Sequence, residues 1–465
     1  MSKINPLRPT LLALALAACF PVLAQSNAEV LTELRALRER VTELENKLKA
    51  AEAKTPTAGQ WGMTPEQARE LNRVTVKAEA LEDARDAAGL RLLKISGYMD
   101  PTFIYNKAQN RSGFQFLNKV DVANGGDGYN YDNSYFGAAV IDFQKETESG
   151  TRWRLTLAPN RGVGAVFDGS SPVHEASVSI PLGSLQQRLI VGQLPDWSGY
   201  EYLQPTLNKL VTHNLLFDFT LPTAYTGVGF EITEGKWIVK SMLANLNTSK
   251  KLPGNNTPVL TYRVDYSKGE FNGFGFAGVH GKATNFRADD GVGNPVTLAP
   301  YDLRDTSVNL FEADGYFIRG DWTVQGQFSY GRQRSAGITA DPVSGELRDA
   351  KWWGASGLVA YKFTPRFEGT ARLDYVKNDK NGGGLLGYNF ADGRNGLGPD
   401  PAGDPEVGAN RTALTLGLSY LFDLNTTFKV EYRLDRANLP VFEYLKDGSM
   451  RKSNSLFGAS VLVSF

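Results

Sequence analysis

Apolar and polar residues alternate along most of this chain, from Leu93 to the last residue. Trp153 to Leu157 and Phe428 to Asp435 keep a strict period of two, with apolar side chains in one row and mostly charged ones in the other. Because successive side chains of a β-strand point to opposite faces, these segments predict strands with one apolar and one polar face. Aromatic-rich strands of this kind suit a soluble sandwich or a lipid-facing barrel wall.

The lengths of the connections separate these two possibilities. Seven short turns are Glu148–Gly150, Gly183–Gln186, Glu234–Gly235, Gly269–Phe271, Gly320, Thr364–Arg366 and Asp423–Asn425. Eight long polar stretches alternate with them: Lys107–Asn133, Arg161–Pro172, Pro195–Tyr225, Thr248–Pro258, Ala283–Thr306, Gln333–Lys351, Asn378–Asn410 and Ala437–Ser453. Fifteen connections predict an all-β transmembrane barrel of about sixteen antiparallel strands over residues 93–465, with turns on one side of the membrane and loops on the other. The connections of a Greek-key sandwich are not expected to alternate between short turns and long loops.

Residues 1–24 read as an export signal. Lys3 and Arg8 supply the charged region, Leu11 to Phe20 the apolar region, and Ala24 a small residue before the cleavage site. Leu16 to Cys19 also matches a lipoprotein signal, which would leave Cys19 lipidated. Both alternatives place the mature protein beyond the inner membrane.

A heptad pattern follows over residues 25–54. Its seam consists of Val30, Leu34, Leu37, Val41, Leu44, Leu48 and Ala51. Glu33, Arg40 and Lys47 at g positions meet Arg38, Glu45 and Glu52 at e positions with opposite charge, which predicts a parallel coiled coil and a homo-oligomer. In a linker region of residues 55–92, a second helix is expected from Thr64, with Gln67 completing a capping box, to Ala88. This helix extends the coiled coil, lies at the barrel mouth or plugs the lumen. Its weaker apolar seam does not distinguish among these three alternatives.

Composition narrows the function classes. The chain carries 50 Lys and Arg against 50 Asp and Glu, so no global charge favours nucleic acid. A mean hydropathy of −0.30 does not fit a protein of membrane helices, and after residue 24 no apolar run is long enough to span a bilayer. The only cysteine, Cys19, lies in the signal, so no disulfide is expected.

The chain ends in a strand with apolar residues at alternate positions and Phe465 at its terminus. With the signal and the barrel pattern, this ending resembles the Gram-negative outer-membrane porin superfamily. The architecture is most similar to sixteen-stranded trimeric porins with an N-terminal coiled coil, of the dicarboxylate-uptake or phosphate-selective type. The resemblance implies a trimer in the cell outer membrane, contact with outer-membrane lipid, N-terminal helices in the periplasm, and recognition of Phe465 by the barrel-assembly machinery.

In porins the third long connection folds into the lumen and narrows it. Here that connection is Pro195–Tyr225, and its charged residues are candidates for the constriction: Asp196, Glu201, Lys209 and Asp218. Alternation directs five bases of the early strands inward as pore-lining residues: Arg152, Arg154, Arg188, Lys236 and Lys240. A basic wall opposite an acidic loop predicts a transverse field and a mild preference for small anions such as carboxylates. The simpler alternative is that paired lumen charges only solvate the interior.

The function expected is therefore passive diffusion of small hydrophilic solutes; the alternative is a structural or adhesive barrel with a closed lumen. No enzymatic activity, cofactor or metal is expected. The glycine pattern from Gly273 to Gly278 lies in a strand and opens no helix, and His174, His213 and His280 lack metal spacing. Asx residues in two loops are read as turns rather than calcium ligands; they are Asp127, Asn130, Asp132, Asn133, Asp379 and Asn381.

Overall fold

The computed structural model divides the chain into two compact units, Met1–Arg91 and Leu92–Phe465. The structure describes residues 38–43, 45–47, 49, 64–87, 90–117, 136–158, 172–246, 257–284, 305–337, 343–344, 348–378, 396–397, 402–403 and 407–465. The predicted export signal, the seam leucines of the heptad pattern and the Asx residues of the two loops lie outside these residues.

The first unit is helical where it is described. Residues 38–43 are helical, and α3 runs over Pro65–Ala87. The capping box is confirmed, because the Thr64 backbone N–H donates to Gln67 Oε1 at 2.9 Å and the Gln67 N–H donates to Thr64 Oγ1 at 3.2 Å. Among the described residues, no helix has the length and apolar character needed to cross a membrane.

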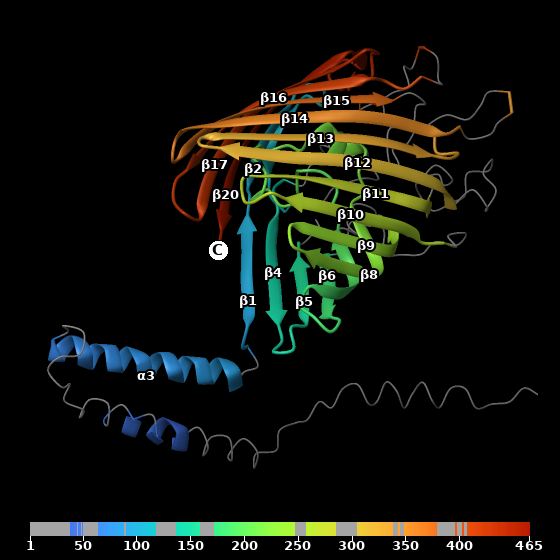
Figure 1. Ribbon diagram of the computed structural model, residues 1–465. Coiled ribbons are helices and arrows are strands. Elements are labelled where there is room, and N and C mark those ends of the chain that lie inside the picture. Colours follow the sequence, from blue (N-terminus) through green and yellow to red (C-terminus); the bar gives the residue numbers. More distant parts are fainter. Residues whose placement is uncertain are drawn as a thin grey trace, which may run out of the picture. The chain divides into compact units, whose positions relative to one another are not determined.

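The second unit is a β-barrel whose strands wind around one axis (Figure 1). The strands are β1 (Leu93–Met99), β2 (Thr102–Asn106), β3 (Arg111–Gln115), β4 (Ala139–Glu146), β5 (Arg152–Leu157), β6 (Val173–Pro181), β7 (Gln187–Pro195), β8 (Ala224–Glu234), β9 (Trp237–Leu246), β10 (Val259–Ser267), β11 (Asn272–Thr284), β12 (Asp305–Arg319), β13 (Trp322–Gln333), β14 (Ala350–Thr364), β15 (Phe367–Asn378), β16 (Arg411–Leu421), β17 (Thr426–Ala437) and β20 (Ser453–Ser464). All neighbours pair antiparallel, and β20 pairs with β1 and β2, which closes the sheet.

Eighteen segments make sixteen barrel strands, as the alternation of turns and loops predicts. The pairs Tyr98↔Ser464 and Thr102↔Ser460 continue one register, so β1 and β2 form a single strand interrupted at Asp100-Pro101. Pro101 has no N–H to donate to a ladder. On the next strand, β3 pairs with β2 and β4 pairs with β1, so this strand position is also divided, between Gln115 and Ala139.

This break corrects one expectation. Lys107–Asn133 was expected to be one long loop, but the chain turns at Lys107 to Asn110 and returns as β3. The Asp100 carboxylate holds the break by accepting from the backbone N–H groups of Gly137 and Ala138, at 3.2 and 2.5 Å. The last long connection also contains a small hairpin, β18 (Phe442–Tyr444) with β19 (Ser449–Arg451).

The seven short turns lie where the sequence predicts them, between strands at one end of the barrel, which is called the turn end here. Gly235 and Gly320 adopt φ of 59° and 57° in two-residue turns, a left-handed conformation that glycine reaches without steric cost. The opposite ends of the same strands are called the loop end (Figure 1). The third long connection spans Asp196–Thr223 and contains α5 (Leu215–Phe219). It is called the inner loop below.

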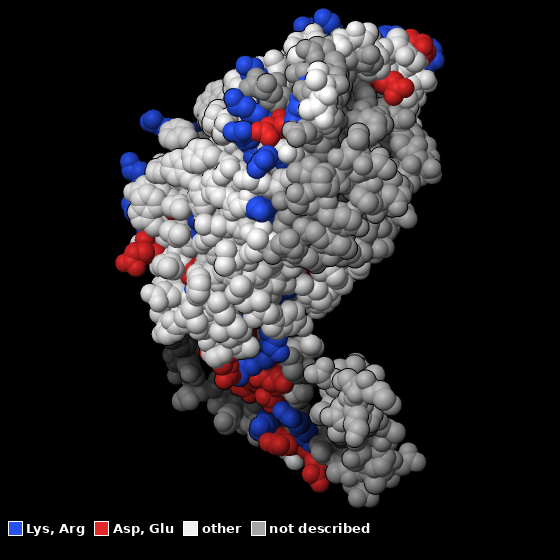
Figure 2. Space-filling model, turned by 90° about the vertical axis from the view of Figure 1, so that its right-hand side faces the viewer, with Lys and Arg blue, Asp and Glu red and all other residues white. Residues whose placement is uncertain are grey.

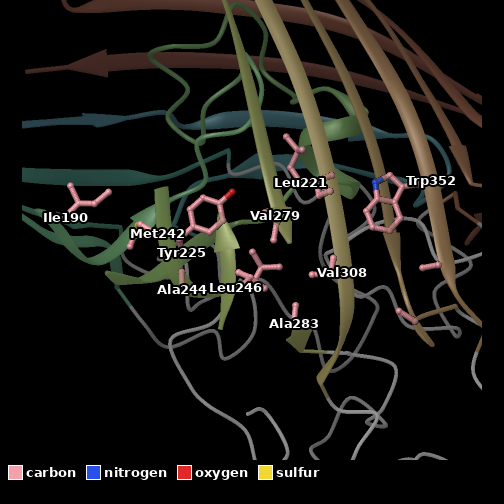
Figure 3. Close-up of a cluster of buried hydrophobic side chains, with 14 residues drawn as sticks. Ile190, Leu221, Tyr225, Met242, Ala244, Leu246, Val279, Ala283, Val308 and Trp352 are labelled. Carbon is pink, nitrogen blue, oxygen red and sulfur yellow. The ribbon is translucent and has the colours of Figure 1, made fainter. Parts of the chain in front are cut away.

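A cluster of buried apolar side chains lies inside the barrel, beside the point where the inner loop returns to β8. Leu221 of the inner loop and Tyr225 of β8 pack there with Met242, Val279 and Trp352 of the wall (Figure 3). All five are at most 1% exposed. Burial of large side chains of this kind stabilises by roughly 1.5–3 kcal/mol each, which fixes the root of the inner loop against the wall.

Candidate functional site: the barrel interior

The register of the sheet shows which side chains point into the barrel. Arg372 on β15 contacts the inner loop, so the alternate residues of β15 that share its face point inward. Arg372 pairs with Leu358 on β14 and Thr415 on β16, and the same face can be followed around all sixteen strands. The opposite face carries apolar residues in the middle of the strands. Val324, Phe328 and Leu416 are examples of that outward row, each at least 40% exposed.

Two of the predicted pore-lining bases lie on β5 and face inward with carboxylates around them. Arg154 Nε donates to Asp142 Oδ1 at 2.9 Å, and its Nη1 lies 3.3 Å from Glu175 Oε2. Arg152 Nε lies 3.1 Å from Glu146 Oε2. The three acids are on β4 and β6, the strands beside β5. Each arginine therefore stands within a mixed cluster and not in a purely basic row.

The other three predicted bases differ in their surroundings. Lys240 on β9 faces inward, with its Nζ 3.2 Å from Glu231 Oε2 on β8. Arg188 on β7 is 2% exposed and donates to the Gly150 carbonyl and Ser179 Oγ, both at 2.6 Å. Lys236 lies in the turn between β8 and β9 rather than on the wall, which corrects the expectation for this residue.

The four acids beside these bases were missed in the sequence: Asp142, Glu146, Glu175 and Glu231. The strand period was the signal that could have found them, because each occupies the inward position of a strand adjacent to a base. Four inward carboxylates thus stand among the four described inward bases Arg152, Arg154, Arg188 and Lys240 from β5 to β9, which removes the expected net positive charge there.

The inner loop begins at a half-buried carboxylate, that of Asp196. Asp196 accepts hydrogen bonds from the Tyr225 hydroxyl and from Ser198 Oγ at 3.0 Å. Burial raises the pKa of Asp196 to about 7, although these hydrogen bonds favour its charged form. Further along, the Tyr200 hydroxyl lies 2.6 Å from Ser356 Oγ of β14. The first residues of the loop are therefore bound to both β8 and β14.

Glu201 anchors the middle of the loop to the wall of β15. Arg372 Nη1 donates to Glu201 Oε1 at 2.7 Å and to the carbonyl of Thr212 at 2.8 Å, while its Nη2 donates to the carbonyl of His213 at 2.8 Å. The Arg372 side chain is 0% exposed and that of Glu201 3%. Asp374 on the same strand accepts from Arg372 Nε at 3.1 Å, so the guanidinium has two carboxylates and two carbonyls.

Further contacts bind the loop to β15 and β17. Lys209 Nζ lies 2.8 Å from Glu368 Oε2. Lys429 Nζ donates to the carbonyls of Pro205 and Asn208 at 2.7 and 2.6 Å. Glu431 accepts from the Val211 N–H at 2.6 Å. The loop thus lies inside the barrel along this half of the wall.

Asp218 lies in α5, close to Arg433. Their charged atoms are 3.9 Å apart, and both side chains are 0% exposed. Asn214 caps α5 by accepting from the Phe217 N–H at 2.8 Å. Leu215, Leu216 and Phe219 pack with Val376 and Ala413 of the wall.

These contacts correct the expected opposition of an acidic loop and a basic wall. The carboxylates of Glu201 and Asp218 are buried and contact arginines on the wall behind the loop, and that of Asp196 is half-buried and hydrogen-bonded. The loop exposes Tyr202 (52%) and Leu207 (57%) instead. Hydrogen-bonded charges between distant segments hold the loop in place, a role that the sequence did not indicate.

The three histidines do not come together. His174 is buried on β6, and His213 is buried in the inner loop with Nε2 2.8 Å from the carbonyl of Tyr202. His280 on β11 stacks outward on Tyr262 at 5.7 Å between ring centroids. In the described part of the chain, no three His, Cys, Asp or Glu side chains are grouped to hold a metal ion. The glycine pattern at Gly273 lies in β11.

The family of the chain follows from a match over residues 62–465, which covers the whole barrel. The match is to a family described as proteins of unknown function, DUF3138. The chain belongs to the DUF3138 family. No curated protein matches its sequence.

Solved structures show what the fold of this DUF3138 member is. The anion-selective porin of Comamonas acidovorans is 8% identical, with a TM-score of 0.50 over 80% of this chain and 99% of that chain. The outer membrane protein OmpT of Vibrio cholerae is 12% identical, with a TM-score of 0.49 over 80% and 97%. The outer membrane channel DcaP of Acinetobacter baumannii is 12% identical, with a TM-score of 0.47 over 80% and 97%. The barrel has the fold of the Gram-negative outer-membrane porins.

Proposed function

We propose that this protein is an outer-membrane pore for passive diffusion of small hydrophilic solutes. The observation that carries the proposal is the contrast between the two faces of the wall. The outward row is apolar, whereas the inward row has charged side chains that remain in part accessible: Arg152 is 54% exposed, and Arg154 and Lys240 are each 34% exposed. Charged groups inside an apolar cylinder are expected where water and ions pass.

A mild preference for small anions is the finer part of the proposal. In the four ion pairs of the early wall, the base is more exposed than its acid. Arg154 is 34% exposed against 8% for both Asp142 and Glu175. Lys240 is 34% exposed against 24% for Glu231. A solute at this wall therefore meets more of the cationic groups than of the carboxylates. Asp265 on β10 is an exception, since it is more exposed than Arg263.

The proposal includes assembly and placement. The protein forms a homo-oligomer, a trimer, joined by the coiled coil of residues 25–54 and by its barrels. The N-terminal helices stand in the periplasm, after cleavage of the signal at Ala24, and Phe465 is recognised by the barrel-assembly machinery. The porin fold of the barrel, the heptad pattern of residues 25–54 and the terminal Phe465 support this arrangement.

Single-channel recording tests the pore itself. Purified full-length protein in a planar bilayer is expected to give stepwise conductance that scales with bulk salt, because the solutes cross in water. Boiled, unfolded protein serves as the blank. A folded barrel without conductance steps would reject the pore in favour of the structural barrel with a closed lumen.

A further inference from the structure

The glycine pattern of β11 has a structural role on the inward face of the wall. Gly273 and Gly275 occupy inward positions, so no side chain rises from β11 there between β10 and β12. A Cβ on Gly275 would lie 2.6 Å from Arg263 Cζ, and one on Gly273 would lie 2.9 Å from Tyr316 Cε1. The arginine of β10 and the tyrosine of β12 therefore lie across the strand between them.

Three carboxylates surround the guanidinium of Arg263. Its Nε donates to Asp265 Oδ1 at 2.8 Å, its Nη2 donates to Asp314 Oδ1 at 2.9 Å, and its Nη1 lies 3.4 Å from Glu312 Oε2. Lys240, the inward base on the neighbouring strand, is itself paired with a glutamate of β8. The cluster thus has three acids for one base, and protonation of Glu312 would still leave one negative charge in excess.

The members of this cluster differ in accessibility. The Asp265 side chain is 33% exposed, against 10% for Arg263 and 7% for Asp314. Glu312 is fully buried behind them, and its Oε1 has no hydrogen-bond partner among the described residues. A solute in the lumen therefore meets a carboxylate, whereas the cation of the cluster is covered.

Tyr202 of the inner loop stands beside this cluster. It is 52% exposed. Burial of its hydroxyl raises the pKa of Tyr202, the carboxylates of Asp314 and Asp265 raise it further, and the charge of Arg263 opposes them. The hydroxyl of Tyr316 acts on it as well. Two phenol rings, one from the loop and one from the wall, thus accompany the exposed carboxylate.

This sector of the lumen contrasts with the rest of the barrel. On the early wall the base is the accessible partner, since Arg154 is 34% exposed against 8% for its two acids. Outside, most of the described barrel surface in Figure 2 is uncharged, and the acidic side chains on it are scattered. The gathering of three acids with two tyrosines is therefore a local feature of the interior at β10 to β12.

We propose that Asp265, Tyr202 and Tyr316 form a binding site for the ammonium group of an organic cation in the lumen. The carboxylate is the counter-ion, and the electron-rich faces of the phenol rings attract alkylammonium groups. An inorganic cation would gain the carboxylate but not the packing of methyl groups on the rings, and a carboxylate solute would be repelled. The inference rests on the proposed pore and adds a second class of solute to it.

The test uses purified full-length protein in detergent, with choline as the probe. Dimethylbutanol, in which a tert-butyl group replaces the trimethylammonium group of choline, is the uncharged counterpart of the same shape. Saturation-transfer NMR of the methyl protons measures both dissociation constants. Choline should bind about 10-fold more tightly than the alcohol, because it alone gains from the carboxylate and the rings.

Variants of the site separate charge, ring and fold. Asp265→Asn should weaken choline binding about 5-fold, while Arg263 keeps its two other carboxylates and the wall its structure. Tyr202→Leu should weaken it about 3-fold, whereas Tyr202→Phe keeps the ring and should bind like wild type. Rescue by phenylalanine distinguishes a lost ring from a displaced loop.

Glu146 on β4 offers a matched control. It is also an inward acid paired with an arginine, and its side chain is 42% exposed, more than that of Asp265. Glu146→Gln should leave choline binding unchanged. The proposal is overturned if choline and the alcohol bind alike, if Asp265→Asn binds choline like wild type, or if Glu146→Gln loses as much. Binding is measured without conductance, so a barrel that binds choline but gives no conductance steps would reject the pore alone.

Discussion

Glu201 of the inner loop and Arg372 of β15 form an ion pair of 2.7 Å in which both side chains are almost fully buried. Their contact joins residues that are 171 positions apart in the chain. Arg372 also donates to two carbonyls of the loop, so a single guanidinium fixes both arms of the loop to the wall. The geometry of the lumen therefore depends on buried charge as well as on the sheet.

Replacing Arg372 by Gln should release the inner loop. Glu201 and Asp374 would be left buried without their cation, a change that costs about 3–5 kcal/mol. We expect faster chymotrypsin cleavage within residues 196–223 of the folded protein and a lower urea midpoint. Arg152→Gln is the control, because its ion pair with Glu146 is half-exposed and such pairs contribute little. Equal protease sensitivity of the two variants would contradict the anchoring role.

Strand number and turn positions could be predicted because their signals are local. Side chains alternate with a period of two, and a two-residue turn such as that at Gly235 needs a left-handed residue. The break at Asp100-Pro101 could also have been predicted, since proline cannot donate to a ladder, but only the pairing of β3 with β2 shows that the neighbouring strand position is divided there as well.

The contacts of the inner loop could not be predicted, because they depend on which distant residues the barrel brings together. Asp218 reads in sequence as an accessible acid of a long loop, yet it lies buried next to Arg433. Likewise, the inward bases of β5 were identified by alternation, but their acids are on neighbouring strands whose register the sequence does not give.

The carboxyl of Asp196, at the start of the inner loop, predicts that the free energy of unfolding depends on pH. Burial raises the pKa of this carboxyl from 3.8 to about 7, with the Tyr225 hydroxyl, Ser198 and the more distant charge of Arg263 favouring the anion. Between these values the unfolded chain releases a proton that the folded one retains, so the free energy of unfolding should fall as pH rises from about 4 to 7 and level off above. The contribution is on the order of 4 kcal/mol.

Urea unfolding of the detergent-solubilised barrel at several pH values measures this effect. Asp196→Asn cannot ionise, so its free energy of unfolding should decrease less between pH 4 and 7 than that of wild type. If the free energy of unfolding depends on pH in the same way for both proteins, the pKa of Asp196 is the same in the folded and the unfolded state.

The seam between the first and last strands predicts an assembly defect. Phe465 exchanges two backbone hydrogen bonds with Gly97, of 3.1 and 3.0 Å, and its ring covers this glycine so closely that a Cβ would lie 2.5 Å from Cζ. Deleting Phe465 or replacing Gly97 by Val should slow the appearance of heat-modifiable barrel on unboiled gels while export continues. Gly357→Val is the control, since a Cβ there meets no described atom within 4 Å. Normal barrel yield without Phe465 would argue against its role.

The heptad pattern predicts how the oligomer responds to charge in its seam. Replacing Leu37 and Leu44 by Asp would bury unpaired carboxylates at the contact between helices and should separate the coiled coil. Chemical crosslinking between the N-terminal helices of neighbouring subunits, measured on the full-length protein, should then decrease. Asp at Ala36 and Thr42, which lie off the seam, should have little effect. Wild-type protein that crosslinks only as a monomer would show that the coiled coil does not form.

Ion selectivity is the property that depends most on the unequal exposure of paired charges. Replacing Arg152 and Arg154 by Gln should shift the reversal potential under a salt gradient towards cations, because the carboxylates of Asp142 and Glu175 would remain without their arginine. Asp142→Asn with Glu175→Gln should shift it the opposite way. Both shifts should diminish with salt, since the Debye length falls from about 30 Å at 0.01 M to about 3 Å at 1 M.

Arg188→Gln provides the comparison for these variants. Its guanidinium faces the same lumen but is covered and bonded to Gly150 and Ser179, so removing it should change the reversal potential less than removing Arg154. Planar bilayer recordings at two salt concentrations measure all four proteins. If wild type prefers cations, or if the Arg152 and Arg154 variant keeps the wild-type potential, exposed arginine does not set the selectivity. The paired charges would then only keep the interior wet, because each base and its acid would cancel at the distance of a passing ion.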